Sequence, residues 1–128
     1  MGVDCCVGTE ACAGFTGEAG VGSCIGIRAC YQASGNVGEN SCTYDEVCVR
    51  NSGDIGNNSC KLNESCMDNE GMVGDGSCDD SWSCRENTGD VGDGSCLGPV
   101  ACYRNSGNIG DGKCIGFDAC NGNTQDMP

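Results

Sequence analysis

The cysteines are the residues of this chain most able to do chemistry, and their spacing is regular. The 128 residues include 15 cysteines and no histidine. Apart from Cys5, the cysteines form pairs that enclose five residues, and each pair begins 18 residues after the previous one. The pairs are Cys6/Cys12, Cys24/Cys30, Cys42/Cys48, Cys60/Cys66, Cys78/Cys84, Cys96/Cys102 and Cys114/Cys120. Such an unbroken short period predicts a tandem repeat in which each repeat forms one structural coil.

Paired cysteines can form disulfides or ligate metal. Zinc sites usually bring cysteines about two to four residues apart and often include histidine, whereas the spacing here is six and histidine is absent. We therefore expect disulfides, and the simplest pairing joins the two cysteines of each repeat, which leaves Cys5 outside the seven pairs. Pairing between neighbouring repeats stays open but is less regular, because seven repeats cannot pair off evenly.

The composition indicates a secreted or extracellular protein stabilised by covalent bridges. Cysteine exceeds the fraction that marks a disulfide scaffold, and disulfides on this scale need an oxidising compartment. Aromatic residues make up only 5% of the chain, so the bridges must replace part of a conventional hydrophobic core. No apolar run reaches membrane-spanning length, and we expect no membrane partner.

The charge and the residue types exclude two further classes of function. The net charge is −13, which argues against nucleic acid because its phosphates would be repelled. Histidine is absent, and no nucleophile with its base and no phosphate-cradling motif is present. We therefore predict that the chain is not an enzyme.

Carboxylates form a second regular series. Asp75, Asp93 and Asp111 share one position of the repeat, and Asp90 lies three residues before Asp93. Stacked ~4.8 Å apart in successive coils, such carboxylates would repel by about 0.9 kcal/mol per pair in water, and bound cations would relieve this cost. Calcium prefers carboxylate and carbonyl oxygens, so these four aspartates are candidate ligands and calcium is the candidate cofactor. The alternative is ordinary turn chemistry, which Gly-Asp-Gly-Ser also fits.

Comparison of the repeats predicts the elements that position these residues. Each repeat divides into three hexads, and the third usually carries Val or Ile followed by Gly, as in Ile55-Gly56. Glycine occurs 23 times and no helical apolar stripe is present, so short extended segments separated by turns fit better than helices. We therefore predict an all-β fold, a single β-solenoid domain over residues 1–128 with about seven coils. The repeats begin at residues 6, 24, 42, 60, 78, 96 and 114.

In such a stack, residues 18 positions apart form a column. An aliphatic column is predicted to point inward, and it consists of Val37, Ile55, Val73, Val91 and Ile109. An asparagine column is predicted to hydrogen-bond turn backbone from coil to coil, and it consists of Asn51, Asn69, Asn87, Asn105 and Asn123. The glycines that follow the asparagine turns are predicted to have positive φ, and they are Gly35, Gly53, Gly71, Gly89 and Gly107.

The Cys-x5-Cys pair in every coil resembles the disulfide-stapled β-helical antifreeze proteins of beetles. The resemblance covers the cysteine spacing of the whole chain and implies an interior bridge in each coil. It also raises ice binding, which that family performs with a flat double rank of threonines in a Thr-x-Thr pattern. The nearest column here is a single mixed rank whose candidate ice-binding residues are Ser52, Thr88, Ser106 and Thr124, and Glu70 interrupts it.

The function that these features favour is an extracellular structural or adhesive module, a rigid rod that spaces, displays or polymerises. The chain enters in mid-coil without a recognisable cap, which motivates the hypothesis of end-to-end self-association. Cys5 is the candidate for making that association covalent. The alternative is a ligand-binding surface, either for ice on the Ser/Thr column or for calcium on the acidic columns.

Overall fold

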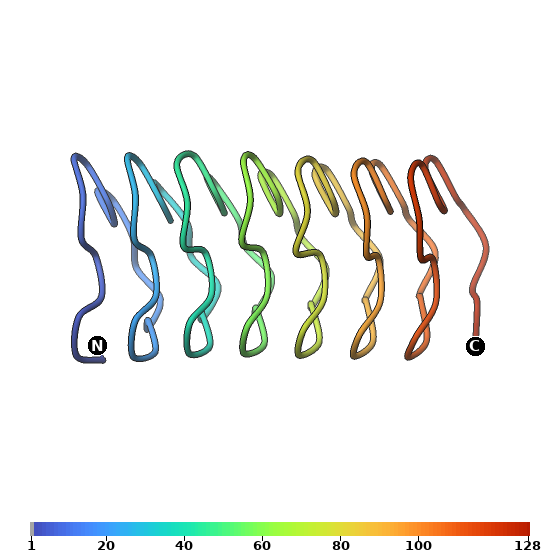
Figure 1. Cartoon of the computed structure of the whole chain (residues 1–128), viewed down its shortest axis with the longest axis horizontal. Helices are drawn as coiled ribbons and strands as arrows, with labels where there is room; N and C mark the ends of the chain where they lie inside the picture. Colours follow the sequence, from blue (N-terminus) through green and yellow to red (C-terminus); the bar gives the residue numbers. More distant parts are fainter. Residues whose placement is uncertain (1) are drawn as a thin grey trace.

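The computed structural model describes residues 2–128 as a stack of coils along one axis (Figure 1). The coils are named here from the first cysteine of each pair: coil 1 is residues 6–23, coil 2 is 24–41, coil 3 is 42–59, coil 4 is 60–77, coil 5 is 78–95, coil 6 is 96–113 and coil 7 is 114–128. The two termini lie at opposite ends of the stack. The five residues between the two cysteines of a coil are called its disulfide loop.

Backbone hydrogen bonds join each inner coil to both of its neighbours. The amide N–H of Cys30 donates to the carbonyl oxygen of Val47 in the next coil at 2.9 Å. The amide N–H of Arg50 donates in the other direction, to the carbonyl oxygen of Tyr31 in the preceding coil at 2.8 Å. Equivalent bonds recur along the stack in steps of one repeat, so the period of the sequence becomes the period of the axis.

The prediction of an all-β β-solenoid is wrong. Residues 2–128 contain no helix and no strand longer than a single bridged residue, and turns and bends make up most of each coil. Eight isolated parallel bridges join neighbouring coils, six along the aliphatic column and two between disulfide loops. The described part of the chain is therefore an irregular disulfide-rich stack, and it contains no helix long and apolar enough to cross a membrane.

Left-handed backbone explains why strands do not form. In coil 4 the φ angles are 53° at Cys60, 57° at Glu64, 55° at Cys66 and 55° at Asp68, and the equivalent positions of every coil also have positive φ. This conformation costs a residue other than glycine about 1–2 kcal/mol and interrupts any extended run. Cysteine does not favour positive φ, so the sequence carries no signal for these interruptions.

The glycines after the asparagine turns do not have positive φ, and that prediction is also wrong. A Cβ atom on Gly53 would clash with the carbonyl oxygen of Gly71 in the next coil, and Gly35, Gly71, Gly89 and Gly107 meet the following coil in the same way. Glycine is required there because the backbones of neighbouring coils approach closely.

The interior contains an aliphatic column, the disulfides and two polar ladders. The five residues of the aliphatic column are at most 4% exposed, which confirms their predicted inward direction. The asparagine column forms a ladder, but the bonds between coils join side-chain amides and not side chain to backbone as predicted. Asn69 Nδ2 donates to the carbonyl oxygen of Gly71 in its own turn at 2.7 Å and to Oδ1 of Asn51 in the preceding coil at 2.8 Å. A second ladder uses serine, where the hydroxyl of Ser59 donates to the carbonyl oxygen of Gly74 at 2.8 Å.

Candidate functional site

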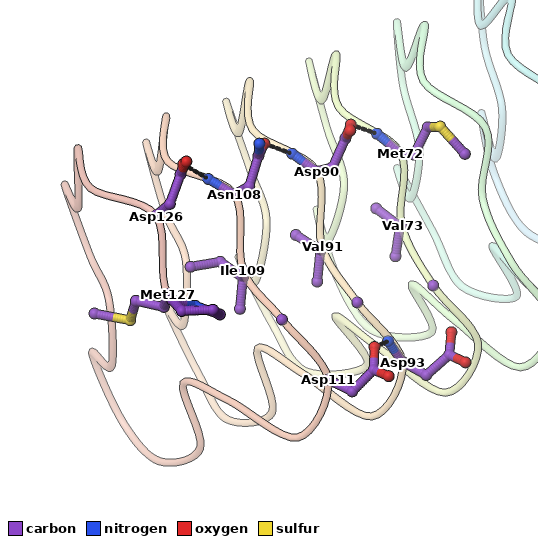
Figure 2. Close-up of a pocket in the computed structure, with 14 residues that line it drawn as sticks. Met72, Val73, Asp90, Val91, Asp93, Asn108, Ile109, Asp111, Asp126 and Met127 are labelled. Atoms are coloured by element: carbon purple, nitrogen blue, oxygen red, sulfur yellow. Dashed lines mark hydrogen bonds between the residues drawn. The ribbon is translucent and has the colours of Figure 1, made fainter.

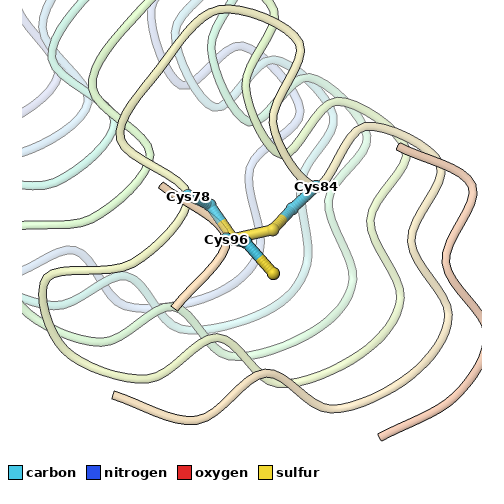
Figure 3. A group of neighbouring side chains, drawn as sticks. All are labelled: Cys78, Cys84 and Cys96. Atoms are coloured by element: carbon cyan, nitrogen blue, oxygen red, sulfur yellow. A yellow bond between two sulfur atoms is a disulfide. The ribbon is translucent and has the colours of Figure 1, made fainter. Parts of the chain in front are cut away.

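Each coil is closed by a disulfide between its own two cysteines. The seven bridges are Cys6–Cys12, Cys24–Cys30, Cys42–Cys48, Cys60–Cys66, Cys78–Cys84, Cys96–Cys102 and Cys114–Cys120, with Cα–Cα separations of 5.4–5.9 Å. The sulfurs of neighbouring coils stack: those of Cys78, Cys84 and Cys96 all lie within 4.8 Å of one another (Figure 3). Metal ligation needs thiolates, so the oxidised sulfur column offers no metal site.

Cys5 takes no part in the seven disulfides. It stands at the repeat position that serine occupies in coils 1 to 5. Its Sγ donates to the carbonyl oxygen of Gly2 at 2.9 Å. Cys5 therefore lies at the start of the serine ladder.

The four aspartates predicted to bind calcium lie on one exposed face, in two columns. Asp75, Asp93 and Asp111 form one column, and Asp90 belongs to the other. One oxygen of each carboxylate caps the preceding coil: Oδ1 of Asp93 accepts the amide N–H of Asp75 at 2.8 Å, and Oδ1 of Asp90 accepts that of Met72 at 3.0 Å. Within residues 2–128, no three carboxylates bring oxygens within 4.8 Å of one another. Calcium binding stays a prediction.

A groove of about 700 Å³ runs between these two columns along coils 4 to 7 (Figure 2). Asp90 and Asp93 flank it, and the Val91-Gly92 step lies between them. Neither column contains Lys or Arg. We call this surface the acidic face.

The candidate ice-binding residues form one exposed column beside the acidic face. Ser52, Thr88, Ser106 and Thr124 are all exposed. The neighbouring exposed column, two residues further along, carries Asp54, Met72, Asp90, Asn108 and Asp126. The second rank therefore mixes acidic, amide and apolar side chains and contains no threonine, and ice binding stays a prediction.

In contrast to the acidic face, where neither column contains Lys or Arg, other columns of the stack bring opposite charges together. In each ion pair an arginine of one coil lies next to a carboxylate of a neighbouring coil. Arg50 Nε donates to Oδ1 of Asp68 and Arg104 Nε to Oε2 of Glu86, both at 2.7 Å. The hydrogen bond from Arg104 lowers the pKa of Glu86 below its ordinary value, and the hydrogen bond to Asp68 raises the pKa of Arg50. Two further pairs join Arg28 to Glu46 and Arg85 to Glu64.

Two of these arginines also lie over aromatic rings. The guanidinium carbon of Arg85 is 4.3 Å from the centroid of the Trp82 ring, and that of Arg104 is 4.9 Å from the centroid of the Tyr103 ring. The two rings are 5.8 Å apart. Arg85 and Arg104 are therefore each held by an aromatic face together with a carboxylate, whereas Arg28 and Arg50 pair with a carboxylate alone.

The disulfide loops of coils 3, 4 and 5 were not identified from the sequence as a candidate site. Between the loops of coils 3 and 4 lies a pocket of about 310 Å³, lined by Tyr44, Asp45, Glu46, Asn63 and Glu64. A signal in the sequence could have indicated it. Coils 1, 2, 6 and 7 begin with Cys, an aliphatic residue and Gly and end the hexad with Ala, whereas coils 3 to 5 read CTYDEV, CKLNES and CDDSWS.

The fold and the bridges define a disulfide-bonded tandem-repeat protein with one bridge per 18-residue coil. The chain belongs to the family described as Domain of unknown function (DUF7640), whose model matches residues 1–99 and, in a second match, residues 42–127. No curated protein and no solved structure matched the chain. A relationship to the beetle antifreeze proteins is not shown, and the shared feature is the spacing of the cysteines.

Proposed function

We propose that the chain is a structural or adhesive module of an extracellular protein, a stiff rod that sets a distance and presents side chains along its length. The observation that carries the proposal is the covalent closure of every coil combined with hydrogen bonds that keep one register along the stack. Short disulfide loops restrict the unfolded chain, and each is worth about 2.4 kcal/mol by the chain-entropy estimate. Disulfide density of this kind is typical of extracellular proteins.

The geometry of the repeat supports a spacing role. Neighbouring coils joined by parallel bridges are about 4.8 Å apart, so seven coils give a rod of about 34 Å. Because each coil makes its hydrogen bonds with the coils before and after it, whole coils can be added without new kinds of contact. A molecule of this design changes length in steps of one coil.

A length-variation experiment tests the proposal. Two chains are secreted from a eukaryotic host behind a heterologous signal sequence. One is the original chain, and in the other residues 42–95 are duplicated to add three coils. The longer chain should gain about 14 Å in maximum dimension by small-angle X-ray scattering. By mass spectrometry the original chain should keep its seven bridges, and the longer chain should contain a further bridge in each added coil. A duplication of residues 42–86, which adds half a coil too few, is the control and should disturb the register. The proposal would be contradicted if the chains stayed in the cell without disulfides, or if the longer chain had the same maximum dimension as the original.

The two alternative ligands, ice and calcium, and end-to-end self-association stay predictions. No observation in the described residues favours one of them over the rod.

A further inference from the structure

We propose that the pocket between the disulfide loops of coils 3 and 4 binds an arginine side chain presented by a partner protein. The inference names the partner chemistry of the proposed adhesive module and rests on that function. It begins with the place of the pocket. The loops that line it belong to the coils whose first hexads depart from the Cys-aliphatic-Gly pattern of the other coils.

The lining of the pocket is rich in hydrogen-bond acceptors. Asp45, Glu46 and Glu64 contribute carboxylates, Asn63 an amide and Tyr44 a phenol ring. Arg28 pairs with Glu46, and Arg85 pairs with Glu64. Among residues 2–128, no ion pair involves Asp45, whose Oδ1 accepts the amide N–H of Ile27 at 2.8 Å. Three carboxylates against two guanidinium groups leave one negative charge, which a single cation would balance.

The chain itself shows which cation fits this combination of groups. Arg85 lies over Trp82 and pairs with Glu64, and Arg104 lies over Tyr103 and pairs with Glu86. The pocket repeats both ingredients, because Tyr44 supplies a ring and Asp45 a carboxylate. Within the described residues, no cation lies over the ring of Tyr44. The Tyr44 ring and the Asp45 carboxylate thus have no guanidinium partner among the described residues, and we assign that place to a guanidinium from another molecule.

Arginine suits the pocket better than lysine. A guanidinium is planar, weakly hydrated and able to stack on a ring while it donates to a carboxylate, whereas an ammonium is a compact and strongly hydrated charge. The rim favours a protein as the carrier of this group. Tyr44 is 49% exposed and Leu62 is 40% exposed, so apolar surface continues beyond the polar pocket. Interfaces between proteins are enriched in such aromatic and arginine contacts.

Three peptides test the proposal on the oxidised full-length chain: acetyl-Gly-Arg-Gly-amide, its lysine analogue and its citrulline analogue, a neutral isostere of arginine. Amide shifts in heteronuclear NMR spectra report binding at each residue. The arginine peptide should give saturable shifts centred on Tyr44–Glu46 and Asn63–Glu64. The lysine peptide should bind more weakly, and the citrulline peptide should give no saturable shift. Absence of saturation with the arginine peptide, or equal binding of citrulline, would overturn the proposal.

Matched variants separate the pocket from the general negative charge. Asp45→Asn removes the charge but keeps an Oδ1 that can accept the Ile27 amide, and Tyr44→Leu introduces the residue that coil 4 has at this position. Each variant should bind the arginine peptide about three-fold more weakly, the effect expected from losing an exposed cation–π contact or ion pair. Asp93→Asn is the control, because it removes the same charge and keeps the same kind of amide cap on the acidic face. Equal weakening by Asp93→Asn would assign the binding to bulk electrostatics and reject the pocket.

The outcome is independent of the length-variation experiment. If the duplicated chain is longer but the arginine peptide does not bind, the proposed function is supported and the inference about the pocket is wrong. If the peptide binds in the pocket but the duplicated chain is not longer, the pocket is supported and the rod is wrong.

Discussion

The polar ladders and the disulfide loops of coils 3 to 5 are two regions of the same coils that follow opposite rules. In the ladders, one residue type recurs at each position, as at Asn51, Asn69 and Asn87, because each side chain bonds to its copies in the neighbouring coils. In the loops, Tyr44, Leu62 and Asp80 share one position without any common chemistry. A buried ladder gains hydrogen bonds when neighbouring coils carry the same residue, whereas a loop closed by its own disulfide does not depend on its neighbours in this way.

The largest expected effect comes from opening a loop. The double change Cys60→Ser and Cys66→Ser should lower the free energy of unfolding by about 2.4 kcal/mol, because the unfolded chain regains the entropy that the bridge removed. Replacing residues 61–65 by Ile-Gly-Ile-Arg-Ala, the loop of coil 2, should cost much less. Urea unfolding followed by circular dichroism measures both. A loop exchange as costly as the lost bridge would remove the distinction between the two regions.

Coil 4 has one asparagine in the ladder, Asn69, and one in the disulfide loop, Asn63, so the same substitution can be compared in both regions. Asn69→Ala should lower the free energy of unfolding by about 2 kcal/mol, because Oδ1 of Asn51 and Nδ2 of Asn87 each lose a buried partner. Asn63→Ala, in the exposed disulfide loop, should change it by less than about 0.5 kcal/mol. Thermal and urea unfolding of the two variants give the values, and similar losses would show that the ladder is not the more demanding region.

The smallest expected effect concerns the exposed ion pair of Glu86 and Arg104. Because the pKa of Glu86 is lowered in the folded chain by the hydrogen bond from Arg104, the pair stabilises the fold above the unfolded pKa of about 4.3. This stabilisation is lost as the pH falls through the lower folded pKa. A carbon-13 titration of the Glu86 carboxyl should therefore move to higher pH in Arg104→Gln. An unchanged midpoint would show that Arg104 does not hold this carboxylate.

The difference between the two regions also explains which features could be predicted from sequence. The columns of Val91 and Asn69 follow from the period alone, because identical residues in successive coils must lie above one another. The pocket beside Tyr44 and Asn63 could not be found in this way, since it depends on residues that are not repeated. The acidic columns also follow from the period, but the role of their carboxylates does not. Oδ1 of Asp93 accepts the amide N–H of Asp75 in the preceding coil.

By itself, the sequence determined the 18-residue period, the pairing partners that the spacing makes simplest, and the residues of the aliphatic and asparagine columns. Only the tertiary structure decided the local conformation of each coil. Positive φ at Cys60 and Cys66 interrupts the extended runs, and the close approach of Gly53 to Gly71 requires glycine without a left-handed turn. The physical reason is that the disulfide within each coil and the contacts between coils 18 residues apart override the local preferences of the residues.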